Sequence, residues 1–233
     1  GMTKHAMCRS YRTYVTHGIA WNPDALIGHN PGALGPIVSI GKQLNIPMLF
    51  DAEDYHRGEF QEGSHESIRV EKLEDNCIPQ ITAMTAASPL IAKTYESLYP
   101  QHQVTTVNNA FSKKGQSRQP LPKSGPLKVI WFSQMVGLDR GLEEFLCGMG
   151  LAKNVPIQLN VLGLCSKEVH QHLLDSMQSD AHQITVHPPM AESALFAFIA
   201  EHEIGLALEV ALTENREICR TNKLYSFALA GCH

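Results

Sequence analysis

The hydrophobic and polar residues of the chain alternate between two periods from Pro23 onward. Short runs of apolar and β-branched residues, typical of buried strands, are followed by segments whose apolar residues recur with the spacing of one helix face. Strands are predicted at 25–28, 48–51, 81–86, 104–107, 127–132, 157–162, 184–186 and 204–208, and helices at 33–44, 66–76, 88–98, 140–149, 166–177, 191–201 and from 221 onward. This alternation predicts an α/β protein with mostly parallel sheets.

One segment near the middle of the chain lacks either pattern. Residues 108–126 contain Asn, Ser, Lys, Gly and three prolines with almost no apolar residue, a composition typical of linkers. We therefore divide the chain into a partial N-terminal domain at 1–118, a linker at 119–126 and a C-terminal domain at 127–233. Four strand-then-helix units in succession make the C-terminal domain Rossmann-like.

Composition narrows the class of protein without naming a function. With 43% hydrophobic residues and a net charge of −4, the chain can bury a core but carries no basic field for nucleic acid or an anionic membrane. The six cysteines show no C-x-x-C spacing, which favours reduced, buried thiols and a cytoplasmic protein. No apolar run has the length of a membrane span. Gly1, which precedes Met2, is typical of a residue left by removal of an affinity tag, and it is not used to predict the fold.

Polar residues gather where the predicted strands end. In parallel sheets, ligands bind at the carboxyl ends of the strands, beside the N-termini of the following helices. His29 and Asn30 follow the first predicted strand, and the second is followed by a charged segment of Asp51, Glu53, Asp54, His56, Arg57 and Glu59. Its carboxylates are suited to acid/base chemistry or to orienting a sugar hydroxyl or a metal. The alternative is a solvated loop.

Two cationic residues of the second half are candidates for anion binding. Arg140 lies in a glycine-containing loop, Gly137 to Gly141, that leads into a helix and is suited to phosphate. Alternatively, Arg140 pairs with a nearby glutamate on the surface. Lys223 lies in the first turn of a predicted helix, where the macrodipole disfavours a cation unless an anionic ligand is bound. The alternative is a lysine that points to solvent. His170 and His172 diverge on a helix and are predicted to be surface residues.

Three stretches resemble the group 1 (family four) glycosyltransferases, which have the GT-B fold. They are "PDALIGHNPGALGPIVSIGKQLNIPMLFDAEDYHRGEF", "VIWFSQMVGLDRGLEEFL" and "IGLALEVALTENREICRTNKLYSFALAG". The resemblance implies two Rossmann-like domains that face a cleft, with the nucleotide-sugar donor held by the C-terminal domain and the acceptor by the N-terminal one. It also implies transfer with retention of configuration and without a catalytic metal or other cofactor.

The resemblance also implies roles for individual residues. The donor-binding set is Gly137, Arg140, Gly141, His187, Glu209, Asn215, Arg216, Asn222 and Lys223. The catalytic set is His29, Glu53 and Asp54, and the acceptor-side set is Asn30, Asp51 and Glu59. No residue is assigned to a metal. Arg140 and Lys223 would stabilise the charge that develops on the departing diphosphate.

The sequence departs from the family pattern at several positions. Glu53 stands where the family usually has a histidine, and Ser226 and Ile218 stand where it has the two glutamates of the E-x7-E motif. Glu209 is a candidate for the missing carboxylate. The family has a further strand and glycine loop before the first residue and further elements after the last, so we expect a truncated chain.

The leading hypothesis is a retaining glycosyltransferase that moves a sugar from a nucleoside diphosphate to a glycan, lipid-linked or small-molecule acceptor. The alternatives are a non-catalytic, nucleotide-binding remnant of the same fold and a nucleotide-sugar epimerase. No nucleic-acid partner is expected. The resemblance implies a cytoplasmic protein in polysaccharide biosynthesis, and peripheral association with the inner face of the membrane stays open as an alternative.

Overall fold

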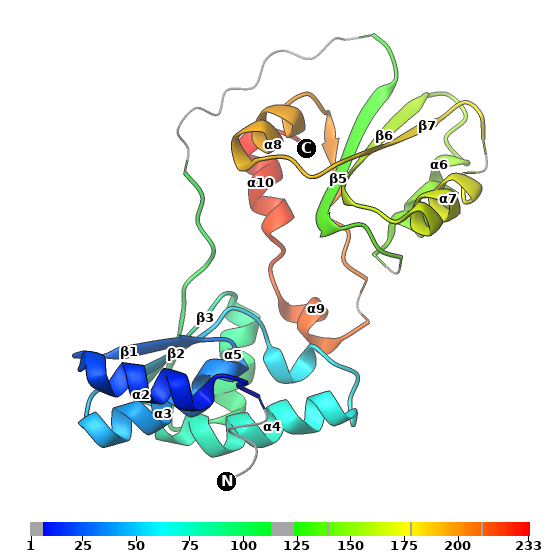
Figure 1. Ribbon diagram of the computed structural model, residues 1–233. Coiled ribbons are helices and arrows are strands. Elements are labelled where there is room, and N and C mark those ends of the chain that lie inside the picture. The colour runs from blue at the N-terminus through cyan, green and yellow to red at the C-terminus, as the bar shows by residue number, and fades with distance from the viewer. Residues whose placement is uncertain (1–6, 113–123, 139, 178, 211) are drawn as a thin grey trace. The chain divides into compact units, whose positions relative to one another are not determined.

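The computed structural model describes residues 7–112, 124–138, 140–177, 179–210 and 212–233. They form two compact units, each built on its own parallel four-stranded sheet. Unit 1 comprises residues 1–109 and 211–220, and unit 2 comprises residues 110–210 and 221–233. Figure 1 shows both sheets with their labelled helices. Each unit is an α/β, Rossmann-like domain, as the alternating pattern predicts.

Unit 1 has the strand order β1-β2-β3-β4, all parallel. The strands are β1 (Leu26–His29), β2 (Met48–Ala52), β3 (Ala83–Ala86) and β4 (Val104–Thr106). The helices are α2 (Tyr11–Trp21), α3 (Pro31–Leu44), α4 (His65–Cys77), α5 (Pro89–Leu98) and α9 (Glu214–Ile218), with short 3-10 turns at His56–Gly58 and Ile78–Gln80. In Figure 1, α3 and α4 lie on one side of this sheet, and α2 packs beside α3.

Local sequence signals explain where these helices begin and end. Ser64 and Ser88 cap α4 and α5, because each side-chain oxygen accepts a hydrogen bond from a backbone N–H three residues ahead. Asn45 ends α3 in the left-handed conformation. The core of unit 1 lies between these helices and the sheet and includes Phe50 and Tyr95, both fully buried.

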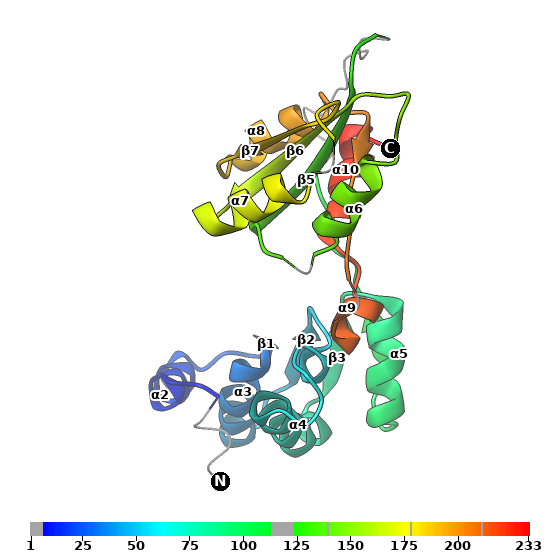
Figure 2. The same ribbon diagram turned by 90° about the vertical axis from the view of Figure 1, so that its right-hand side faces the viewer.

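Unit 2 has the strand order β7-β6-β5-β8, again all parallel. The strands are β5 (Leu127–Met135), β6 (Ile157–Leu164), β7 (Gln183–His187) and β8 (Ile204–Gly205), and the helices are α6 (Leu142–Met149), α7 (Lys167–Asp175), α8 (Glu192–Ile199) and α10 (Asn222–Ala230). Alternate residues of β5 face opposite sides of the sheet. Trp131 packs in the cluster of α6 and α7, whereas Ile130 packs in the cluster of α8 and α10. Figure 2 shows the unit from a second side.

The predicted elements are present, with shifts at their ends and two omissions. Strand β5 continues to Met135 through an irregularity in its pairing with β6, and β8 is shorter than predicted. Helix α2 was not predicted because it has no fully buried residue and therefore no strong apolar stripe. Helix α9 is only five residues long, too short to show a helical period.

The compact units and the sequence-based domains group two segments differently. Residues 110–112, which the sequence places in the N-terminal domain, belong to unit 2. Residues 211–220 belong to unit 1, although the sequence places them between elements of the C-terminal domain. Several contacts hold the segment there. Ile218 packs against the core of unit 1, and Ser88 Oγ donates a hydrogen bond of 2.7 Å to the Ile218 carbonyl. The proposed linker at 119–126 falls mostly outside the described residues.

Two expectations from composition, on the burial of the cysteines and on membrane-spanning segments, can be compared with the structure. Cys8, Cys77 and Cys232 are buried as expected, but Cys147 is exposed on α6 and Cys165 and Cys219 are half-buried. Burial of all the thiols was therefore a wrong prediction. Among the described residues, no helix combines the length and the hydropathy that a membrane span requires.

Candidate functional site

The carboxyl edge of the sheet in unit 1 carries a row of polar side chains on three adjacent strands. The register pairs His29 of β1 with Asp51 of β2, and Asp51 with Thr85 of β3. His29 Nδ1 lies 3.1 Å from Asp51 Oδ2, and the Thr85 hydroxyl donates to Asp51 Oδ1 at 2.5 Å. Glu53 extends the row, with its Oε1 3.7 Å from His29 Nδ1. The parallel register therefore brings together three of the residues chosen from the sequence.

Asn30 joins β1 to α3 in an unusual backbone conformation. It is the N-cap of α3 with a φ of 66°, and its side chain makes no capping hydrogen bond. With a ψ of 152°, Asn30 lies outside the left-handed helical region, in a backbone conformation that residues other than glycine rarely adopt. Pro31, the first residue of α3, has no backbone N–H, so the first turn of the helix has one unpaired donor fewer. The exposed Asn30 amide thus lies beside His29 at the strand end.

The charged segment after β2 divides into two groups with different surroundings. Arg57 turns inward, and its Nε donates to the fully buried Glu74 at 2.9 Å while its Nη2 donates to Asp75 at 2.6 Å. The Glu74 carboxylate also accepts from the Tyr95 hydroxyl at 2.7 Å. Burial raises the pKa of Glu74, and the Tyr95 hydrogen bond and the Arg57 charge oppose that rise. The Arg57 guanidinium is therefore part of the packed structure of unit 1. The alternative of a solvated loop does not hold for Arg57.

Asp54 and Glu59 have partners other than His29. His56 is almost fully buried and its Nδ1 lies 2.8 Å from Glu59 Oε1. Asp54 Oδ1 accepts a hydrogen bond of 3.0 Å from the Asn215 amide. Burial raises the pKa of Asp54, with the Asn215 hydrogen bond acting in the opposite direction. A carboxyl with a raised pKa is suited to general acid work.

Asn215 and Arg216 belong to unit 1, whereas the other residues expected to bind the donor belong to unit 2. Asn215 is buried, and both ends of its amide are used: Oδ1 accepts from the Tyr55 N–H at 2.8 Å and Nδ2 donates to Asp54. A buried amide needs all its partners, so Asn215 anchors α9 against the segment after β2. Arg216 is half-buried on the same short helix.

In unit 2, Lys223 lies in the first turn of α10 with its ammonium group almost buried. Its Nζ is 2.6 Å from Glu209 Oε1 and 5.6 Å from the centre of the Trp131 ring. Thr221 caps the helix by accepting from the Lys223 N–H. The lysine therefore does not point to solvent, because its charge is paired with Glu209 and rests on an aromatic face. Glu209 supplies a carboxylate to this cluster, and Ser226 is buried within α10 with its hydroxyl bonded to the Asn222 carbonyl.

The glycine loop after β5 packs against the same part of unit 2. Gly141 is the N-cap of α6 with a φ of 82°, and a Cβ there would lie 3.2 Å from the Leu208 Cβ. Leu208 directly precedes Glu209, so Gly141 and the Lys223 ion pair lie at one edge of this sheet. Arg140 is half-buried beside Gly141, and within the described residues its guanidinium has no ion pair. Gly137 has open space around its Cα.

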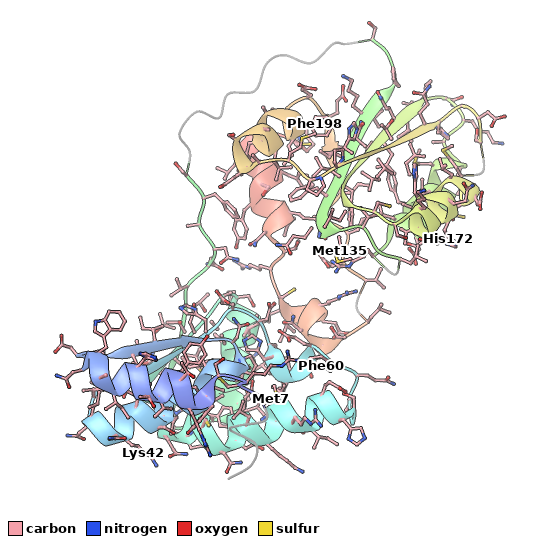
Figure 3. The ribbon with its side chains drawn as sticks, viewed as in Figure 1. Met7, Lys42, Phe60, Met135, His172 and Phe198 are labelled. Carbon is pink, nitrogen blue, oxygen red and sulfur yellow. The ribbon has the colours of Figure 1, made fainter. Side chains whose placement is uncertain are left out.

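His187 and Asn222 complete the expected donor set. His187 Nε2 lies 2.8 Å from Asn160 Oδ1, and its ring packs edge-on against Phe198 of α8, which Figure 3 labels. Burial lowers the pKa of His187. Asn222 is the exposed first residue of α10. His172 is exposed on α7, as expected of a surface histidine (Figure 3).

Three residues of these clusters were not selected from the sequence. Thr85 is the second-last residue of a predicted strand, so its place beside Asp51 follows once the strand order is known. Asn160 is a buried polar residue of β6 with apolar residues on either side, and that position was a usable signal. Trp131 lies within a buried strand like any core residue, and only the tertiary contact with Lys223 distinguishes it.

Two Rossmann-like units with parallel sheets are the architecture of the GT-B glycosyltransferases, and solved structures of that class match the chain. HepE from Anabaena, in complex with UDP and glucose, aligns with a TM-score of 0.70 at 13% identity over 98% of this chain and 62% of HepE. TarM from S. aureus, in a complex that includes UDP, aligns with a TM-score of 0.65 at 12% identity over 94% of this chain and 43% of TarM. The lipopolysaccharide outer core galactosyltransferase WaaB aligns with a TM-score of 0.58 at 13% identity over 84% of this chain and 54% of WaaB.

These alignments establish the fold class of the chain. The chain spans 43% to 62% of the length of these three proteins. No protein-family model and no curated protein matches the sequence.

Proposed function

We propose that this chain carries out sugar transfer from a nucleoside-diphosphate sugar to a glycan, lipid-linked or small-molecule acceptor, with retention of anomeric configuration. The GT-B fold supports the proposal, as do the UDP complexes of HepE and TarM. Because those complexes contain UDP, we favour a uridine donor. The retaining outcome rests on the resemblance to the family four enzymes.

The single observation that carries the proposal is the buried cation of unit 2. Lys223 is at the N-terminus of α10, 2.6 Å from Glu209, and the Gly141 loop packs against the residue before Glu209. Cleavage of a sugar–diphosphate bond leaves negative charge on the leaving group, which a fixed ammonium and a helix N-terminus stabilise without reorganisation. We assign Lys223 and Arg140 to the diphosphate, and Gly137, Gly141, His187, Glu209 and Asn222 to the remainder of the donor.

The polar row of unit 1 supplies the groups for the acceptor. We assign His29, Glu53 and Asp54 to catalysis and Asn30, Asp51 and Glu59 to acceptor binding. The Asp51 carboxylate next to His29 Nδ1 fixes the orientation of the imidazole, which is how a carboxylate commonly prepares a histidine for proton transfer. Asn215 is assigned a structural role in unit 1, because its amide bonds the Tyr55 N–H and Asp54, and Arg216 keeps its assignment to the donor.

Nucleotide binding is the first test. UDP, GDP and ADP are titrated by calorimetry and by thermal shift, since a ligand that binds only the folded state raises its stability by RT ln(1 + [L]/Kd). We expect UDP to bind. The Lys223→Met substitution should lower the affinity for UDP about 10- to 100-fold, because a charged hydrogen bond contributes about 1.5–3 kcal/mol. Methionine keeps the aliphatic packing on Trp131. The control is Lys167→Met, which removes an exposed lysine from the first turn of α7.

Product analysis then separates the three functions. Transfer yields a new glycosidic product whose anomeric configuration is read by NMR, whereas an epimerase yields an altered nucleotide sugar without an acceptor. We expect His29→Ala to abolish transfer without changing the affinity for UDP. Absence of binding by all three nucleotides contradicts the proposal, and binding without turnover favours a non-catalytic nucleotide-binding protein.

A further inference from the structure

An apolar groove of about 580 Å³ lies in unit 1 between α2, β1 and α3, and His29 is one of the residues that line it. The other lining side chains are mostly apolar and include Trp21 of α2, Ile27 of β1 and Pro36 of α3. We propose that the acceptor is a sugar joined through a phosphate to a single apolar chain, and that this groove binds the chain. The inference rests on the proposed sugar transfer and selects one of its acceptor classes.

The groove begins at the carboxyl edge of the sheet, beside the groups that we assign to catalysis. Its lining extends along α3 from Gly32, just after His29, to Ile40. At 1.5 Å per residue, this part of the helix is about 12 Å long. The Met7 carbonyl is 3.0 Å from the position of a Cβ on Gly32, so the segment before α2 lies at the His29 end of the groove. A chain bound along α3 therefore has its polar end next to His29.

The walls of the groove expose large apolar side chains to water. Trp21 is 85% exposed, and Tyr14 and Ile27 are each 61% exposed. Helix α2 has no fully buried residue, and β1 is the terminal strand of its sheet, a position where proteins commonly place charged side chains. Contiguous exposed apolar surface of this kind marks a binding site. Because the groove leads to His29, an apolar part of the acceptor is the occupant that its position favours.

Two arginines at the same end supply a place for the phosphate. Cys8 lines both the groove and a smaller hollow of about 200 Å³, which is also lined by Arg9 and Arg12. Both arginines are exposed, and residues 7–23 contain no Asp or Glu, although the whole chain has a net charge of −4. Guanidinium groups match phosphate with paired N–H donors. The hollow and the groove therefore suit a phosphate and the apolar chain attached to it, with the sugar at His29.

The first test measures binding of single-chain alkyl phosphates by calorimetry, without nucleotide and below the critical micelle concentration of each compound. We expect the affinity to rise about two- to fourfold with each added methylene, the factor expected when a methylene leaves water. The rise should stop once the chain is longer than the groove. Alkyl glucosides of equal chain length, which have no phosphate, should bind about 10-fold more weakly, because they lose the charged hydrogen bonds.

Two variants with matched controls locate the binding site. Ile27→Glu places a carboxylate in the groove and should weaken binding of dodecyl phosphate at least about 10-fold. Its control is Leu90→Glu, which changes a 52% exposed residue of α5 outside the groove. Arg12→Gln should remove the preference for the phosphate over the glucoside, and Lys42→Gln, an exposed lysine of α3, is its control. Circular dichroism confirms that each variant is folded.

Several outcomes would overturn the proposal. They are equal affinity of the parent and Ile27→Glu for dodecyl phosphate, and affinities that do not change with chain length. A dimer in sedimentation velocity that Ile27→Glu dissociates and dodecyl phosphate does not would assign the groove to a second copy of the chain. Binding to phosphatidylglycerol vesicles that dodecyl phosphate does not displace would assign it to a membrane surface.

Separate measurements distinguish failure of this inference from failure of the proposed sugar transfer. The affinity for UDP and transfer to sugars without a lipid are measured with the same protein. Transfer to lipid-free sugars as efficient as transfer to a lipid-phosphate sugar would overturn the inference and leave the proposed transfer intact. Absence of nucleotide binding contradicts the proposed transfer, whatever the affinity for alkyl phosphates.

Discussion

Removal of the Arg57 side chain is predicted to destabilise unit 1 strongly. The Glu74 carboxylate is fully buried, and Arg57 is its only cationic partner among the described residues. In Arg57→Ala this carboxylate keeps the Tyr95 hydroxyl but loses its compensating charge. Loss of one partner of a buried ion pair costs about 3–5 kcal/mol, because the other charge stays in a poorly polarisable interior. The Asp75 contact adds little, since that carboxylate is 60% exposed.

The effect is predicted to depend on pH, with a sign that follows from Glu74. Burial already raises the pKa of this carboxyl in the folded protein, and loss of Arg57 raises it further. A group whose folded pKa exceeds its unfolded pKa favours the folded state at low pH, and that contribution is lost as pH rises through the folded pKa. The difference in unfolding free energy between the parent and Arg57→Ala should therefore be larger at pH 8 than at pH 5.

Thermal and urea unfolding followed by circular dichroism measures the loss, and hydrogen exchange of the α4 amides assigns it to unit 1. Arg69→Ala is the control. It removes an exposed arginine of α4, the helix that contains Glu74, and should change the free energy of unfolding by less than about 0.5 kcal/mol. Addition of Glu74→Gln to Arg57→Ala should recover part of the loss, because the buried charge is gone. A loss below about 1 kcal/mol that does not vary with pH would refute the reasoning.

Three further predictions concern other contacts. Gly141→Ala should destabilise unit 2 and weaken UDP binding in calorimetry, because its φ of 82° is unfavourable for alanine and the new Cβ crowds its neighbour. Asn215→Ala should cost about 1–3 kcal/mol in urea unfolding, because it leaves the Tyr55 N–H and the Asp54 carboxyl without this partner. Burial lowers the pKa of His202, so its contribution to stability should be lost as pH falls below the ordinary histidine range, and His202→Gln should flatten the unfolding profile between pH 7 and pH 5.

The sequence predicted part of the row of polar side chains at the carboxyl edge of the sheet in unit 1. His29, Asp51 and Glu53 were selected because they follow predicted strands, and the parallel register then sets them side by side. The charges alone did not show whether the segment after β2 is a solvated loop or packs against the rest of unit 1. Arg57 and Glu53 belong to the same charged run, yet one is buried against Glu74 and the other is half-exposed beside His29.

By itself, the sequence determined the α/β class, the order of strands and helices and the ends of most helices. These are local properties, because apolar periodicity, Ser and Thr caps and left-handed Asn and Gly act within a few residues. Only the tertiary structure decided the partners of charged and amide groups: Lys223 with Glu209, Arg57 with Glu74, and Asn215 with the segment after β2. Those pairs join residues distant along the chain, and long-range packing selects among partners that sequence spacing cannot distinguish.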